Sequence, residues 1–120
     1  MAFDWREYVK LAHKLSGESE TCQPEAEYRS GVSRAYYGAF CYARNRAMAS
    51  LNYSPARTAE DHRDLKEFLK THGHAEAASS LDTLRQWRNS CDYDDNVAPK
   101  APDILLYMAL LHADAVIQGL

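Results

Sequence analysis

The segment from His74 to Tyr93 has a charged side chain where an amphipathic helix needs an apolar one. At 100° per residue, its apolar residues form one narrow stripe: Ala77, Leu81, Leu84 and Cys91. Arg88 falls in the middle of that stripe, with Arg85 one turn earlier and Asp92 one turn later on the same side. A charge directed at a core must be paired, or must line a cleft at a subunit boundary. Arginine there could bind phosphate, because its planar guanidinium makes bidentate contacts with phosphate oxygens.

A structural interpretation of the same residues stands beside the chemical one. Arg88 and Asp92 have the i,i+4 spacing of an ordinary ion pair on a helix. In that interpretation the pair only closes the end of the helix. The position of Arg88 within the apolar stripe favours the functional interpretation.

A second group of cations lies on the long segment Pro24 to Leu51. From Arg29 onward this segment has four arginines and no carboxylate: Arg29, Arg34, Arg44 and Arg46. Arg29 shares the angle of the Tyr36 and Phe40 face, so it is expected to point inward. Arg46 is expected to pair with an acid or to extend over apolar surface, while Arg29 and Arg34 could be paired or functional. Interleaved tyrosines such as Tyr37 offer stacking surfaces for nucleobases.

Metal binding is a weaker interpretation of the polar residues. His62, His72 and His74 could suggest zinc, but no cysteine has a suitable spacing and four-ligand patterns are usual in structural zinc sites. The acidic run that begins at Asp92 could bind a cation, although a solvated loop that caps the helix end is favoured. We therefore expect no metal and no cofactor.

Composition favours an all-helical fold. The 120 residues include only five glycines and four prolines, so we expect one domain over residues 1–120 with a real core. The net charge of −3 requires any nucleic-acid surface to be a local patch. No membrane span and no signal peptide is expected, and three cysteines without CxxC spacing indicate reduced thiols, so we expect a cytoplasmic protein.

Periodicity, caps and breakers predict a compact up-and-down bundle of about five helices. The expected helices run from about Asp4 to Ser16 with Gly17 as the stop, from Pro24 to Leu51, from Thr58 to Gly73, from His74 to Tyr93, and from Asp103 onward. Thr58 and Asp61 resemble a capping pair, and Asp103 is the expected N-cap of the last helix. That helix is expected to pack through Ile104, Met108, Leu111 and Ala115.

The second helix is the expected centre of the bundle, because it has the widest apolar face. That face comprises Val32, Tyr36, Ala39, Phe40, Ala43 and Ala47. Small residues beside it should let neighbouring helices approach closely: Gly31, Ala35, Gly38 and Ala39.

Two strings together resemble the HEPN superfamily. They are Ser33-Arg34-Ala35-Tyr36-Tyr37-Gly38-Ala39-Phe40 on the second helix and Arg88-Asn89-Ser90-Cys91-Asp92-Tyr93 at the end of the fourth. The resemblance extends over nearly the whole chain and implies a helical bundle that forms symmetric homodimers. Many such domains are metal-independent ribonucleases that act as toxins or defence effectors, and small members are often encoded beside a nucleotidyltransferase that neutralises them.

The usual family motif is an Arg, often followed by Asn, and then a His four to six residues after the Arg. Arg88 and Asn89 match it, whereas Tyr93 stands where the His is expected. This ending resembles HEPN lineages that lack the standard His. The spacing from Arg57 to His62 also fits the motif, but it lies at the start of the third helix, and we interpret His62 as structural.

The resemblance implies a protein that binds or acts on RNA or a nucleotide in a prokaryotic toxin–antitoxin or defence system. Arg88 would contact phosphate, Asp92 would fix Arg88, Asn89 and Tyr93 would orient the substrate, and Arg34 would extend the basic surface. Tyr37 and Arg85 complete the expected RNA-binding set. If the protein is a ribonuclease, Tyr93 or Asp92 replaces the missing His. The alternative is a non-catalytic dimeric interaction module whose partner is a nucleotidyltransferase.

Overall fold

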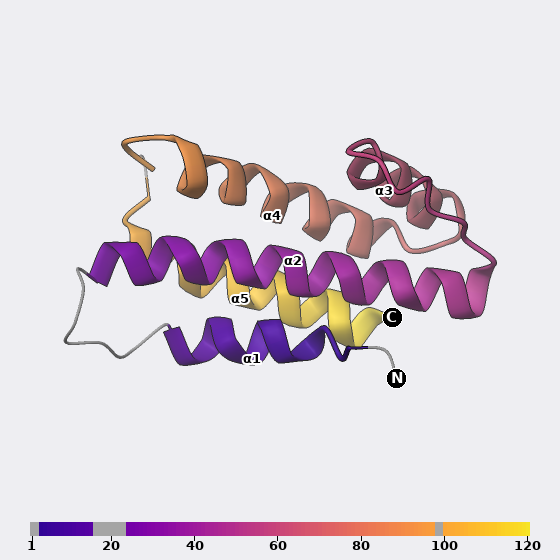
Figure 1. Cartoon of the computed structure of the whole chain (residues 1–120), viewed down its shortest axis with the longest axis horizontal. Helices are drawn as coiled ribbons and strands as arrows, with labels where there is room; N and C mark the ends of the chain where they lie inside the picture. Colours follow the sequence, from indigo (N-terminus) through magenta and orange to yellow (C-terminus); the bar gives the residue numbers. More distant parts are fainter. Residues whose placement is uncertain (1–2, 16–23, 98–99) are drawn as a thin grey trace.

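The computed structural model describes residues 3–15, 24–97 and 100–120, and these residues form five α-helices (Figure 1). The helices are α1 (Arg6–Leu15), α2 (Pro24–Leu51), α3 (Asp61–Thr71), α4 (Ala75–Tyr93) and α5 (Pro102–Gly119). The predicted all-α bundle of about five helices is confirmed. The expected stop of α1 at Ser16 and Gly17 lies outside the described residues, as does Cys22.

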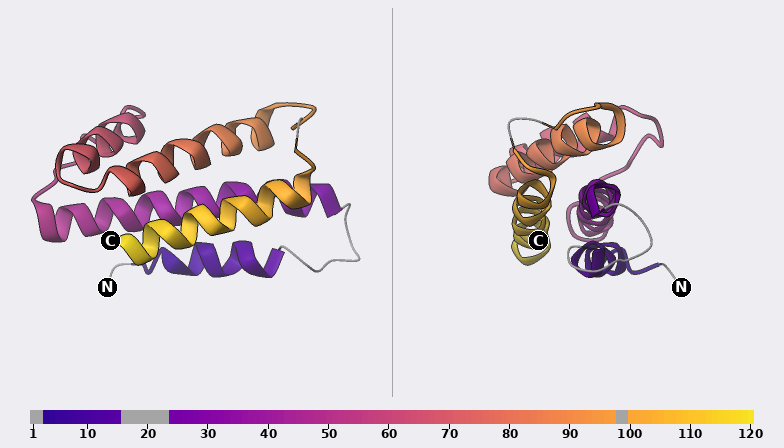
Figure 2. Two further views of the ribbon diagram at one scale, coloured as in Figure 1. Left: turned by 180° about the vertical axis from the view of Figure 1, so that it is seen from behind. Right: turned by 90° about the vertical axis from the view of Figure 1, so that its left-hand side faces the viewer.

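Helices α1, α2, α4 and α5 lie along the long axis, and successive ones run in opposite directions (Figure 1). Helix α2 packs against α1, α4 and α5, which makes it the centre of the bundle as predicted. The short helix α3 lies over the first half of α4 and packs mainly against it (Figures 1 and 2). None of the described helices is long and apolar enough to span a membrane.

Small residues on α2 set how closely its neighbours approach. A Cβ added at Gly38 would lie 2.8 Å from Val9 Cγ2 and 3.1 Å from the backbone oxygen of Trp5, so α1 needs glycine there. A Cβ at Gly31 would lie 2.9 Å from the methyl groups of Leu106 on α5. The predicted close approach at these two glycines is confirmed.

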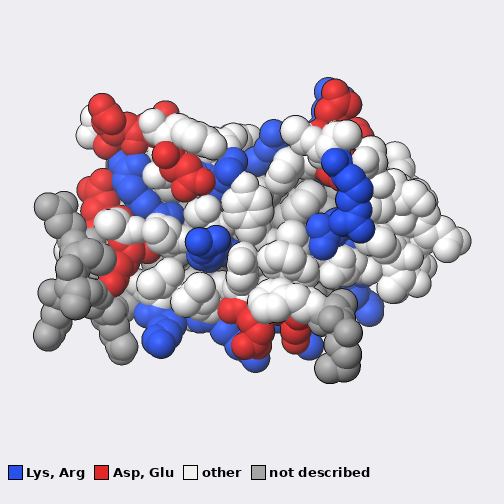
Figure 3. Space-filling view, in the orientation of Figure 1, with Lys and Arg blue, Asp and Glu red and all other residues white. Residues whose placement is uncertain are grey.

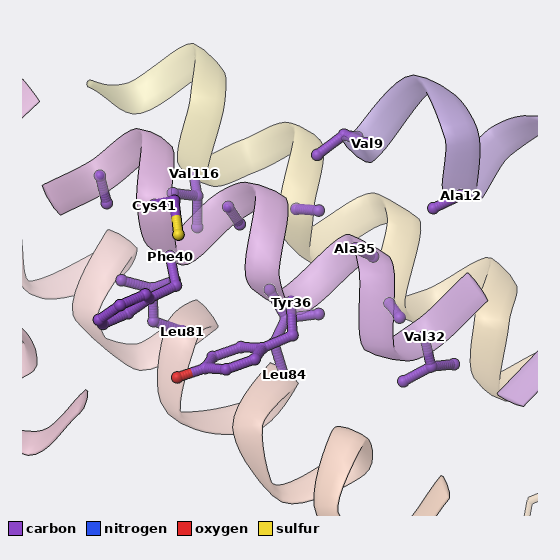
Figure 4. Packing of buried hydrophobic residues seen from close by; sticks show 14 of the residues in the cluster. Val9, Ala12, Val32, Ala35, Tyr36, Phe40, Cys41, Leu81, Leu84 and Val116 are labelled. Atoms are coloured by element: carbon purple, nitrogen blue, oxygen red, sulfur yellow. The ribbon is translucent and has the colours of Figure 1, made fainter. Parts of the chain in front are cut away.

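The apolar face of α2 is buried along its whole predicted extent. Tyr36 and Phe40 project from α2 toward α4, where Leu81 and Leu84 lie (Figure 4). The predicted stripe of α4 is also buried, since Leu81, Leu84 and Cys91 are at most 5% exposed. Both described cysteines, Cys41 and Cys91, are free thiols in the core, and burial raises the pKa of Cys91 to about 11.

Two predictions about α5 are wrong. The helix begins with Pro102 at its first position and Ala101 as N-cap, so Asp103 is not the cap. Its expected packing face is also wrong, because Ile104 and Leu111 are 53% and 55% exposed. The face that packs consists of Leu105, Leu106, Ala109, Leu110, Ala113 and Val116. Helix α5 is apolar on both sides, so periodicity alone could not choose between them.

The predicted start of α3 is also corrected. The helix begins at Asp61 with Glu60 as N-cap, and no side chain caps it. The Asp61 carboxylate, buried in a residue only 8% exposed, instead accepts hydrogen bonds from the backbone N–H groups of Ala56 and Arg57 at 3.0 and 2.8 Å. Arg57 has a φ of 64°, a backbone strain that this carboxylate holds in place. These two hydrogen bonds fix the turn before α3, and the next residue, His62, contacts α2.

Candidate functional site

Arg88 is held on the inner side of α4 by three neighbours. Its side chain is 18% exposed, and one of its terminal nitrogens donates a hydrogen bond to the phenol oxygen of Tyr37 on α2. Its other terminal nitrogen donates to Asn89 Oδ1 at 2.8 Å. The guanidinium carbon also lies 4.9 Å from the Tyr37 ring centroid, within range of a cation–π contact. The expected inward position of Arg88 is confirmed.

The Nε atom of Arg88 is ion-paired with Asp92 but lacks a well-angled hydrogen bond. The Nε atom lies 3.0 Å from Asp92 Oδ2, so charge attraction joins the two side chains at the predicted i,i+4 spacing. Nevertheless, this buried Nε–H makes no hydrogen bond of acceptable angle with any group in the described ranges. The Asp92 carboxylate balances the charge at Nε, so a ligand anion would meet the terminal nitrogens, each of which makes one hydrogen bond and has a second N–H.

Arg85, one turn before Arg88, is a second cation without a fixed partner. It is partly buried, and it forms no ion pair or hydrogen bond with another residue in the part of the chain that the structure describes. Its charge acts on Tyr36 and His62. Arg85 and Arg88 therefore place two positive charges on one side of α4, and the carboxylate of Asp92 pairs with Arg88.

His62 joins the same group of side chains, which the sequence did not reveal. Its Nδ1 is hydrogen-bonded with the hydroxyl of Tyr36, and its ring stacks on Phe40 with centroids 4.5 Å apart. Its centroid lies 6.4 Å from that of Tyr37, the residue that Arg88 contacts. Burial and the nearby charges of Arg85 and Arg88 lower the pKa of His62, so the imidazole is neutral at pH 7.

Arg29 fastens the end of α4 that carries this group. Its guanidinium donates hydrogen bonds to the carbonyl oxygens of Cys91, Asp94 and Asp95 at 2.9, 2.7 and 2.8 Å. Its Nε pairs with Glu25 at 2.8 Å. These carbonyls lie at the unsatisfied C-terminal end of α4, where a cation is favourable. Of the two interpretations left open for Arg29, the structure therefore supports pairing.

The remaining predicted residues divide between this group and other places. Tyr93 is 74% exposed at the end of α4, and its ring centroid lies 5.7 Å from the guanidinium carbon of Arg88. Asp92 also accepts a 3.4 Å hydrogen bond from Ser33 on α2. Arg34, by contrast, is exposed and lies over the ring of Tyr8 on α1 at 5.4 Å, so it faces away from α4.

We call the group formed by Tyr37, Arg85, Arg88, Asn89 and Asp92 the Arg88 cluster. Figure 3 shows one face of the molecule in the orientation of Figure 1: separate groups of Lys and Arg side chains are scattered among uncharged ones, and acidic side chains gather at the upper left. Within the described residues, no group of three or more His, Cys, Asp or Glu side chains could hold a metal ion.

Comparisons with protein-family models, with curated proteins and with solved structures find no match to this chain.

Proposed function

We propose that this protein binds single-stranded RNA and that the Arg88 cluster contacts the phosphodiester backbone. The observation that carries the proposal is the Arg88 guanidinium, which Tyr37 and Asn89 hold in place while each terminal nitrogen keeps a second N–H for a ligand. A guanidinium held by Tyr37 and Asn89 with terminal N–H donors left over is preorganised for a phosphate oxygen.

The neighbours of Arg88 support the same ligand. Arg85 supplies a second positive charge, so one or two phosphates could be neutralised on this face. Tyr93, largely exposed beside Arg88, offers a flat ring on which a base can stack. Stacking on an exposed aromatic requires an unpaired base, which favours single-stranded over duplex RNA.

The resemblance to HEPN domains carries the proposal further. In that form the protein belongs to a prokaryotic toxin–antitoxin or defence system, works in the cytoplasm as a homodimer, and has a nucleotidyltransferase as its neutralising partner. A metal-independent ribonuclease activity would appear as RNA cleavage in the presence of EDTA. Such cleavage must be lost in Arg88→Ala, because the guanidinium would stabilise the charge that develops on the phosphorus oxygens.

Fluorescence anisotropy with a labelled single-stranded RNA tests the binding proposal. Arg88→Ala should weaken binding about tenfold or more, the effect of losing one hydrogen-bonded charge. Arg63→Ala is the matched control, because it also removes one arginine, but from an exposed α3 site where the side chain pairs with Glu60. Equal affinity of the two variants would overturn the proposal.

A second candidate follows from the ion pair of Arg88 with Asp92. In this interpretation the pair is structural, and the protein is a non-catalytic dimeric module that binds a nucleotidyltransferase. It predicts that Arg88→Ala lowers the free energy of unfolding by about 1–2 kcal/mol, because a partly exposed ion pair and the hydrogen bond to Tyr37 are lost, without any RNA affinity to lose. Chemical denaturation of the variant, beside the anisotropy measurement, distinguishes the two candidates.

A further inference from the structure

Two adjacent tyrosines of α2 connect α3 to the Arg88 cluster on α4. Tyr37 accepts the hydrogen bond of Arg88, and Tyr36 is hydrogen-bonded with His62. The rings of Tyr36 and Tyr37 are themselves 5.3 Å apart. His62 is thereby held beside the cluster although it comes from a different helix and lies 26 residues before Arg88 in the chain.

The burial of Tyr36 fixes which nitrogen of His62 carries the proton. Tyr36 is 1% exposed, and among the described residues its hydroxyl has no hydrogen-bond partner except His62. A buried O–H must donate to an acceptor, and Nδ1 of His62 is the acceptor within reach. A neutral imidazole whose Nδ1 accepts a hydrogen bond carries its proton on Nε2.

The surroundings of His62 keep this form. From α2, the ring is faced by the phenols of Tyr36 and Tyr37, and from α4 by the charges of Arg85 and Arg88. On its own helix, Asp61 is the one nearby acid, and its carboxylate is engaged by backbone N–H groups. A positive charge on the imidazole would be repelled by both arginines. His62 is only half-buried, so a ligand can reach its ring from solvent.

We propose that His62 is a further RNA-binding residue, which donates a hydrogen bond from its neutral Nε2–H to a non-bridging phosphate oxygen of the strand held by Arg88 and Arg85. The inference rests on the proposed function and names a third donor for the same site. No described residue accepts a hydrogen bond from Nε2, so the donor is free for a ligand. Tyr36 acts as a positioning residue, because it sets the tautomer without touching the RNA.

Two amide variants separate the roles of the two ring nitrogens. His62→Asn keeps an acceptor near the position of Nδ1 for Tyr36 but has no donor at the position of Nε2. His62→Gln places an amide N–H near the position of Nε2. We expect His62→Asn to weaken RNA binding about tenfold and His62→Gln to recover part of that loss. His72→Asn is the matched control, because His72 stacks on Phe68 at the far end of α3.

Three measurements decide the inference. Nitrogen-15 NMR of the imidazole should show the neutral Nε2–H tautomer at pH 7. The affinity ratio of wild type to His62→Asn should be the same at pH 7 and pH 8, because a neutral donor does not titrate in that range. Circular dichroism melts should show that both amide variants fold.

The failures of the two proposals can be told apart. If Arg88→Ala loses affinity while His62→Asn binds like His72→Asn, the role of His62 is overturned and the proposed function stands. A protonated or Nδ1–H imidazole, or an affinity ratio that disappears at pH 8, also overturns it. If Arg88→Ala binds RNA as tightly as wild type, the proposed function fails and takes the role of His62 with it.

Discussion

Replacing Arg29 by alanine should cost the fold about 3 kcal/mol. Its side chain is 17% exposed, and its guanidinium donates to the carbonyl oxygens of Cys91, Asp94 and Asp95 at 2.7–2.9 Å. A hydrogen bond to a charged group contributes about 1.5–3 kcal/mol when water cannot replace it. Asp94 and Asp95 are exposed, so water replaces Arg29 there at small cost. The half-buried hydrogen bond to Cys91 and the smaller contributions of the two exposed bonds, to Asp94 and Asp95, together give the expected loss of about 3 kcal/mol.

Urea denaturation followed by circular dichroism measures this loss in the free energy of unfolding. In a thermal melt, the melting temperature of Arg29→Ala should fall by roughly 10 °C. Arg34→Ala is the matched control on the same helix, because Arg34 is exposed and, among the described residues, its side chain interacts with the ring of Tyr8 alone, a contact that contributes about 0.5–1 kcal/mol. Amide exchange over residues 92–97 should accelerate in Arg29→Ala, because these residues lose their anchor to α2. The reasoning is refuted if Arg29→Ala is no less stable than Arg34→Ala.

Three further predictions concern packing, the α3 turn and pH. Gly38→Ala should lower stability by about 1–2 kcal/mol, because its Cβ meets the Trp5 backbone, whereas Gly31→Ala meets only Leu106 methyls that can move and should be nearly neutral in the same denaturation assay. Asp61→Asn should cost about 1–2 kcal/mol by denaturation, since it removes the charge that two backbone N–H groups bind. The lowered pKa of His62 contributes stability that is full above its ordinary value of 6.5 and is lost as pH falls from there to the folded value; His62→Asn should flatten that part of the stability–pH curve.

Each of these predictions has an outcome that contradicts it. Equal stabilities of Gly38→Ala and Gly31→Ala would mean that α1 moves away from α2 at little cost. Loss in Asp61→Asn no greater than in Asp64→Asn, its exposed neighbour on α3, would show that the turn does not depend on the buried carboxylate. If the stability–pH curve of His62→Asn has the same slope between pH 5 and 7 as that of wild type, groups other than His62 produce the slope.

Helix α4 shows what periodicity can predict. Its stripe has one apolar side, so the angle of Leu81, Leu84 and Cys91 determined which side is buried, and Arg88 followed as an inward charge. The same argument placed α2 at the centre, because only its apolar face is wide enough for several neighbours.

Helix α5 and His62 show what periodicity cannot predict. Helix α5 is apolar around most of its circumference, and the choice between the Leu106 side and the Leu111 side depends on tertiary packing. His62 shares the i, i+3, i+7 face of the buried Leu65 and Leu69, so its inward direction was available from periodicity. Its partner Tyr36 is not available that way, because no local pattern shows which helix α3 meets.

The salt dependence of RNA affinity tests the central claim most directly. We predict that wild type and Arg63→Ala give the same slope of log affinity against log salt concentration, and that Arg88→Ala gives a slope smaller by about 0.7, the value for one phosphate contact on a single strand. Identical slopes for wild type and Arg88→Ala would contradict a phosphate contact by Arg88.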